Sequence, residues 1–105
     1  MPYGLPEKTV ETVRGVLLKY PQIREAVLYG SRAMGNFRNG SDIDLTLKGA
    51  GATSSVAGSV ANDLEDSLVP YTFDISAFSE ISNLDLIDHI NRVGVVFYEQ
   101  KKDHV

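Results

Sequence analysis

The chain has 105 residues and no cysteine, and its formal net charge at pH 7 is −4. This length allows one domain with its own core, and the absence of cysteine excludes disulfides and thiolate metal sites. The negative charge argues against non-specific binding to nucleic acid or anionic membranes, which both require an excess of Lys and Arg. The sequence has no apolar run that could span a bilayer and no basic-then-apolar start, so we expect a cytoplasmic protein.

The first predicted element is a helix that follows Pro6 and ends at Pro21. Proline suits the first helical turn, and apolar residues then recur at helical spacing. The short apolar run "EAVLYG", residues 25–30, predicts a buried central strand. After it, "SRAMG" is expected to form a helical turn with Ser31 as its cap. The pair Asn39-Gly40 marks a turn in the loop that follows.

The segment "DIDLTLK", residues 42–48, alternates between polar and apolar side chains. Such alternation is typical of a half-buried strand, with the aspartates on one face and the apolar residues on the other. The segment "YTFDISAF", residues 71–78, alternates in the same way and places Asp74 on its polar face. The two segments therefore predict a sheet with an apolar face and a face that carries carboxylates.

Further helices are expected around the second alternating segment. Apolar residues from Val56 to Leu68 recur at helical spacing, and Pro70 ends that helix. Ser82 and Asp85 resemble a capping box that opens another helix, and "GVVFYE" predicts a last strand. This order predicts a single domain over residues 1–105, ordered from about residue 6 to 99. We expect an α/β (α+β) fold, with a small mixed sheet and helices packed on one face.

Asp42 and Asp44 point the same way along a strand, about 7 Å apart at roughly 3.3 Å per residue. Two unpaired carboxylates so close raise each other's pKa, and no Lys or Arg lies beside them on that strand face. A divalent cation would remove the repulsion, and carboxylates suit Mg²⁺. Asp74 can supply a third carboxylate. Two cations about 3.5–4 Å apart could then clamp the oxygens of a phosphoryl transfer.

Gly30 and Ser31 predict a place for phosphate at the end of the central strand. A glycine lets a phosphate approach the backbone closely, and Ser31 opens a turn whose N–H groups point outward. The serine hydroxyl can donate a further hydrogen bond. One end of the sheet would thus offer donors for a triphosphate and carboxylates for its metal ions.

These residues together resemble a known signature. "GSRAMGNFRNGSDIDL" is similar to the Gly-Ser … Asp-x-Asp motif of the DNA polymerase β-like nucleotidyltransferase superfamily, and "FDI" at Asp74 is similar to its third-carboxylate strand. The short length resembles the minimal nucleotidyltransferase (MNT) proteins, and the similarity runs from Pro6 to Glu99.

The resemblance implies a nucleotidyltransferase fold and a set of roles. Gly30 and Ser31 would contact the nucleotide triphosphate of ATP, Asp42 and Asp44 would ligate Mg²⁺, with two ions per site, and Asp74 would complete the metal site and help to activate the acceptor hydroxyl. Proteins of this size resemble antitoxins of HEPN–MNT toxin–antitoxin pairs, which transfer AMP from ATP to a tyrosine of the toxin. The implied partner is such a HEPN-like toxin.

Two other functions remain open from the residues alone. A binding module would neutralise a toxin by covering it, with the metal site unused. Transfer to a small molecule such as an aminoglycoside is disfavoured, because larger transferases use a second helical domain to hold one, although a dimer could create a pocket. The sequence leaves homo- and hetero-oligomers equally open.

Several residues carry simpler alternatives. The aspartate pair alone could be a solvated strand face. An EF-hand loop is disfavoured because the aspartate segment lacks the glycine that such a loop needs. A P-loop is disfavoured because the glycine segment before it lacks the required Lys. Arg32 and Ser41 are further candidates for nucleotide binding. Arg32 could equally face solvent, and a hydrogen bond from the Ser41 hydroxyl to its own loop is an alternative. For His89 and His104 we expect a surface role, because neither has a companion ligand in the sequence.

Overall fold

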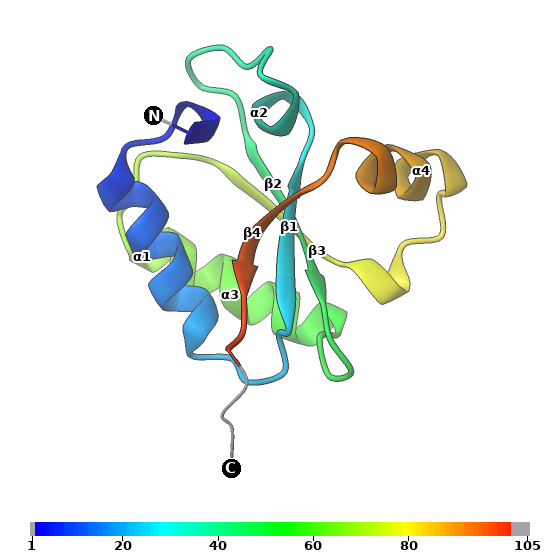
Figure 1. Ribbon diagram of the computed structural model, residues 1–105. Coiled ribbons are helices and arrows are strands. Elements are labelled where there is room, and N and C mark those ends of the chain that lie inside the picture. The colour runs from blue at the N-terminus through cyan, green and yellow to red at the C-terminus, as the bar shows by residue number, and fades with distance from the viewer. Residues whose placement is uncertain (1, 102–105) are drawn as a thin grey trace.

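The computed structural model describes residues 2–101, so His104 lies outside the described residues. Helices and strands follow one another in the predicted order, with two short 3-10 turns added (Figure 1). Within the described chain, no helix combines the length and apolar character that crossing a membrane requires. The elements are η1 Pro2–Gly4, α1 Glu7–Leu18, β1 Glu25–Tyr29, α2 Ser31–Met34, β2 Ile43–Lys48, α3 Ser54–Asp66, β3 Phe73–Ala77, η2 Phe78–Glu80, α4 Leu84–Val93 and β4 Val95–Glu99.

The strands form one mixed sheet in the order β3-β2-β1-β4. Strand β1 runs antiparallel to both of its neighbours, whereas β2 and β3 are parallel and are joined by α3. Because β1 has a partner on each side and Ala26 to Tyr29 are all buried, it is the central strand that the sequence predicts. The predicted class, a small mixed sheet with helices, is confirmed.

One face of the sheet carries the main core. Ile43, Leu45 and Leu47 of β2 are fully buried, in agreement with the predicted alternation. Helices α1 and α3 cover this face (Figure 1). They contribute Val13, Leu17, Val60 and Leu64 to the core.

Helix α4 lies on the other face, which corrects the prediction that the helices pack on one face. Along β1, Val27 and Tyr29 alternate with the main-core residues Ala26 and Leu28, and they form a second, smaller core with Ile90 of α4. These two side chains make the carboxylate face apolar near the middle of the sheet, so that this face also needs a cover. Helix α4 supplies it and therefore lies close to the carboxylates.

The start of α4 differs from the predicted capping box. Asn83, not Ser82, is the N-cap: its side-chain oxygen accepts hydrogen bonds from the backbone N–H groups of Asp85 and Leu86, at 2.9 and 3.2 Å. Asn is as good an N-cap as Ser, and its position one residue later leaves Asp85 in the first turn, where an acidic residue favours the helix dipole.

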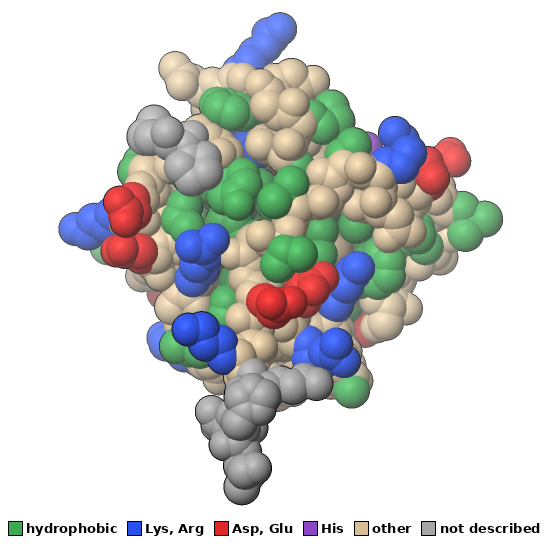
Figure 2. Space-filling view, viewed as in Figure 1, with side chains coloured by type: hydrophobic (Ala, Val, Ile, Leu, Met, Phe, Trp, Pro, Cys, Tyr) green, Lys and Arg blue, Asp and Glu red, His purple; other side chains and the backbone are tan. Residues whose placement is uncertain are grey.

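Charged side chains of both signs are interspersed on the face shown in Figure 2. In the part of that face that the structure describes, neither sign covers a broad area. A nucleic-acid-binding face is expected to gather Lys and Arg in one patch. This face therefore does not show that footprint.

Candidate active site

Asp44 and Asp74 lie beside each other at one end of the sheet. They are register partners on the parallel strands β2 and β3, so their side chains leave the same face of the sheet. Asp42 precedes β2 and is exposed, as Asp74 is. The antiparallel partner of Asp44 on β1 is Tyr29, the residue before Gly30. The fold thus brings the three predicted carboxylates to the end of the sheet where β1 finishes.

The surroundings of Asp44 favour its protonated form. Burial is the largest cause that raises the pKa of the Asp44 carboxyl, the charges of Asp74 and Asp42 raise it further, and His89 lowers it. In residues 2–101, a single ion pair is found, and it joins Arg92 to Asp88 of α4. No Lys or Arg side chain in this range therefore pairs with any of the three carboxylates. Their negative charge is left without a partner.

Mg²⁺ fits the donor chemistry of this edge, because it prefers carboxylate oxygens. As the side chains stand, the described part of the chain holds no group of three or more His, Asp or Glu residues that could bind an ion alone. Mg²⁺ in nucleotide enzymes commonly takes one or two carboxylates and completes its shell with water and substrate phosphates. Asp42, Asp44 and Asp74 therefore suit an ion that binds together with a nucleotide.

Gly30 ends the central strand in a conformation that other residues rarely adopt. Its φ is +74°, and a Cβ atom built on it would lie 2.3 Å from Oδ2 of Asp44. The missing side chain thus makes room for the Asp44 carboxylate. The predicted reason for a glycine here was the approach of a phosphate, whereas the structure shows that a carboxylate already lies against its Cα.

Gly30→Ala is expected to destabilise the fold and to displace Asp44. A positive φ costs a non-glycine residue roughly 1–2 kcal/mol, which corresponds to a fall in Tm of about 4–8 °C or more in a small domain. Gly35→Ala is the comparison variant, because Gly35 has φ +83° but a Cβ there would meet nothing within 4 Å. Thermal unfolding should show a larger loss for Gly30→Ala, because the ψ of −156° at Gly30 adds backbone strain to the clash with Asp44. Equal losses of stability would show that the Asp44 contact does not matter.

Ser31 is the first residue of α2, and Gly30 is its N-cap, so the expectation that Ser31 caps the turn is wrong. A cap residue has non-helical dihedral angles, and Gly30 has them, with φ 74° and ψ −156°. Ser31 is half-buried next to Gly30. Its placement leaves it at the same end of the sheet as the carboxylates.

His89 of α4 reaches this site, contrary to the expected surface role. The backbone N–H of Gly30 donates a hydrogen bond to Nε2 of His89 at 3.2 Å. The imidazole also meets the Tyr29 ring edge-on, with ring centroids 6.1 Å apart. The sequence offers no signal for this contact, because it depends on which face of the sheet α4 covers.

Tyr29 contacts His89 on one side and is the register partner of Asp44 on the neighbouring strand. Its side chain is buried, and burial is the largest cause that raises the pKa of its hydroxyl. A hydrogen bond with Ser76 lowers that pKa, and the charges of Asp74 and Asp44 raise it. The phenol therefore stays neutral beside the carboxylates. Its side chain therefore packs at the end of β1.

Arg32 is buried rather than solvent-facing, with 3% of its surface exposed. Its guanidinium donates two hydrogen bonds to the carbonyl oxygen of Ser41, at 3.1 and 2.9 Å, and one to that of Tyr3 at 2.9 Å. It also stacks near the rings of Phe37 and Tyr71, about 5 Å from each centroid. These contacts argue against the predicted contact with a nucleotide: Arg32 ties the loop before Asp42 to the N-terminal segment.

Ser41 belongs to the same loop, directly before Asp42. Its hydroxyl accepts a hydrogen bond from the backbone N–H of Arg38 at 2.8 Å, and its carbonyl accepts from Arg32. This is the local, loop-forming role that the sequence offers as the alternative to nucleotide binding. The Arg38 side chain is exposed.

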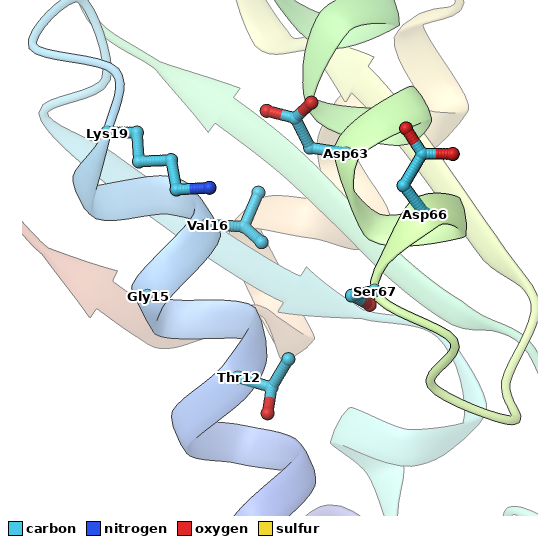
Figure 3. Close-up of a pocket in the computed structure, with 7 residues that line it drawn as sticks. All are labelled: Thr12, Gly15, Val16, Lys19, Asp63, Asp66 and Ser67. Atoms are coloured by element: carbon cyan, nitrogen blue, oxygen red, sulfur yellow. The ribbon is translucent and has the colours of Figure 1, made fainter.

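A groove of about 580 Å³ lies elsewhere, between α1 and α3 (Figure 3). It contains none of the predicted site residues, and the helices that line it cover the sheet face opposite the carboxylates. Asp63 in its wall accepts a hydrogen bond from Tyr20 at 2.5 Å. The groove is thus separate from the candidate active site. Its lining residues are Thr12, Gly15, Val16, Lys19, Asp63, Asp66 and Ser67.

Solved structures with a similar fold come from toxin–antitoxin complexes. One is a toxin–antitoxin crystallised with AMP-PNP, with a TM-score of 0.70 and 18% identity over 92% of this chain and 76% of the other. A second is the MntA–HepT toxin–antitoxin, with a TM-score of 0.67 and 15% identity over 90% and 74%. A third is the tri-AMPylated HEPN toxin of Shewanella oneidensis in complex with MNT antitoxin, with a TM-score of 0.67 and 16% identity over 90% and 72%. At these identities the likeness establishes the fold.

The sequence itself matches one family model, described as polymerase beta, nucleotidyltransferase, over residues 11–103. No curated protein is similar enough to count as a match. The family match spans most of the chain and includes β1, the glycine-serine pair and all three carboxylates. It agrees with the fold and with the resemblance drawn from the motifs: the chain belongs to the polymerase β nucleotidyltransferase family, with an MNT-like fold.

Proposed function

We propose that this protein is a Mg²⁺-dependent nucleotidyltransferase that moves AMP from ATP to a hydroxyl, expected to be a tyrosine, of a HEPN-type toxin, and that it acts as the antitoxin in the cytoplasm. The observation that carries the proposal is the register of Asp44 with Asp74 next to Gly30. The structural neighbours support it, because one of them holds an AMPylated HEPN toxin and another an ATP analogue.

In the proposed reaction, the acceptor oxygen attacks the α-phosphorus of ATP. The bond from that phosphorus to the bridging oxygen breaks, and pyrophosphate leaves. The carboxylate of Asp74, which is exposed, takes the proton of the acceptor hydroxyl. Gly30 and Ser31 hold the phosphates, and Asp42, Asp44 and Asp74 would hold Mg²⁺, which neutralises phosphate charge and orients the in-line displacement.

The partner protein supplies the acceptor in this proposal. Transfer requires donor and acceptor to be held in line, and the edge of the sheet that carries Asp74 is exposed. An external chain that docks there could present a tyrosine to the α-phosphorus. Its identity rests on the likeness to toxin–antitoxin complexes.

Intact-mass spectrometry tests the proposal. The full chain is mixed with ATP, Mg²⁺ and the protein encoded beside it, and the mass of that protein is measured. We expect a mass gain of one or more AMP groups that requires Mg²⁺ and disappears with Asp42→Ala plus Asp44→Ala. Asp66→Ala, on the far side of the molecule, is the control and should leave the gain intact. No gain, or a gain that survives the double variant, contradicts the proposal.

A second candidate is a binding module that covers the toxin without catalysis. It is supported by the structural neighbours, which are complexes of a toxin with its antitoxin. Growth rescue separates the two: a non-catalytic antitoxin protects cells equally well with the double aspartate variant, whereas a transferase loses protection.

A further inference from the structure

We infer that His89 belongs to the nucleotide site, and that its imidazole and a nucleotide phosphate compete for the same backbone N–H, that of Gly30. The inference rests on the proposed function, because it takes Gly30 as a phosphate contact. It adds a residue that the sequence motif does not contain and that lies 59 positions away along the chain.

The hydrogen bond itself is the first step. Gly30 N–H donates to Nε2 of His89 at 3.2 Å, so Nε2 carries no proton and the ring is the tautomer with its proton on Nδ1. A well-aligned N–H serves one acceptor, since hydrogen bonds weaken steeply away from linearity. A phosphate oxygen that accepts from this N–H would therefore occupy the place that Nε2 now takes.

The surroundings of His89 hold the ring in that place. Its imidazole packs edge-on against Tyr29, with an angle of 80° between the ring planes. The next residue, Ile90, is buried and fixes α4 against Val27 and Tyr29. His89 is thus a half-buried group aimed at the site rather than a mobile surface side chain.

The Cα of Gly30 offers a phosphate little room. The Cα of Gly30 faces Oδ2 of Asp44, which lies 2.3 Å from the position of a Cβ. A phosphate that accepts from the N–H of Gly30 would therefore have to displace the imidazole of His89, so helix α4 partly covers the phosphate position.

Binding of AMP-PNP with Mg²⁺, measured by calorimetry on the full chain, tests this. Removing a competing neutral hydrogen bond is expected to tighten nucleotide binding about 3- to 10-fold in His89→Ala. His89→Phe keeps a ring against Tyr29 but lacks the acceptor, and should also bind more tightly. Asn91→Ala, an exposed change on the same helix, is the control and should bind as the wild type does.

Each outcome decides the matter. Weaker or unchanged nucleotide binding in His89→Ala overturns the proposed competition. A His89→Phe protein that binds like the wild type, while His89→Ala binds more tightly, also overturns it, because the bulk of the ring would then control access of the nucleotide to Gly30. In the wild type, saturation with Mg²⁺ and AMP-PNP should move the ¹⁵N resonance of His89 Nε2 toward that of a free imidazole, and an unmoved resonance also overturns it. If neither the wild type nor His89→Ala binds AMP-PNP, the proposed function fails instead.

Discussion

Replacing Asp44 with Asn is expected to make the protein more stable while it strongly reduces AMP transfer. The carboxylate of Asp44 is half-buried beside two other negative charges, so its ionised form is disfavoured in the folded state. Asn removes the charge at nearly constant volume. Discounted for solvent screening, the gain is roughly 0.5 kcal/mol, or about 2–4 °C in Tm for a domain of this size. Transfer should fall roughly 100-fold or more, because a metal ligand is lost.

The pH dependence of this gain has a definite sign. Because the pKa of Asp44 is raised in the folded state, that state binds the proton more tightly than the unfolded chain does. Ionisation of Asp44 therefore costs stability at neutral pH, and the wild type recovers that stability as the pH falls through the folded-state pKa. The difference in Tm between the wild type and Asp44→Asn should be largest near pH 7 and shrink toward pH 4.

Asp66→Asn is the matched control for this experiment. Asp66 is exposed at the end of α3, away from the site, so its removal should change neither Tm nor transfer appreciably. An Asp44→Asn protein that is less stable than the wild type at pH 7 would mean that the carboxylate is already neutralised by a partner. An Asp44→Asn protein that still transfers AMP would exclude Asp44 from the metal site.

Replacing Arg32 with Met is expected to cause a larger loss of stability than substitution of any other buried polar side chain in the described part of the chain. The buried guanidinium donates hydrogen bonds to the carbonyl oxygens of Ser41 and Tyr3 and lies near the rings of Phe37 and Tyr71. Leaving those carbonyls without a donor costs roughly 2–4 kcal/mol, which urea unfolding measures directly. Transfer should fall as well, since Ser41 directly precedes Asp42.

Limited trypsin digestion checks the same variant at the loop. If Arg32 holds the loop, Arg32→Met should speed cleavage after the exposed Arg38 under native conditions. Arg32→Lys should lie between the two, because an ammonium group cannot reproduce the forked pair of hydrogen bonds to Ser41. Arg38→Met is the stability control and should unfold within about 0.5 kcal/mol of the wild type. An Arg32→Met protein with unchanged stability would return Arg32 to the candidates for nucleotide binding.

The strands and the carboxylate edge could be predicted from the sequence because their signals are local. Alternation along residues 42–48 assigns the faces of β2 without knowledge of its neighbours, and the structure buries Ile43, Leu45 and Leu47 as expected. That Asp74 lies opposite Asp44 needs the parallel register of β2 with β3, which the structure shows. The resemblance implied only that Asp74 completes the metal site.

The features that were missed depend on contacts between distant segments. Whether α4 covers the core face or the carboxylate face is settled by Val27 and Tyr29 together with Ile90, and the position of His89 follows from that choice. The position of Arg32 likewise depends on distant segments: the N-terminal segment supplies the carbonyl oxygen of Tyr3, and Phe37 and Tyr71 supply the two rings near its guanidinium. Sequence periodicity contains no information on either contact.

The central claim is that the glycine-serine pair and the three carboxylates form one site for a nucleotide and its metal ion. Mn²⁺, which suits the same oxygen ligands as Mg²⁺, broadens the NMR signals of nearby amides and so maps the ion directly. With AMP-PNP present, the account predicts that substoichiometric Mn²⁺ broadens the amides of Gly30, Ser31, Asp42, Asp44 and Asp74 first. Broadening centred on Asp63 and Asp66 in the groove between α1 and α3, or equal broadening with and without the nucleotide, would contradict it.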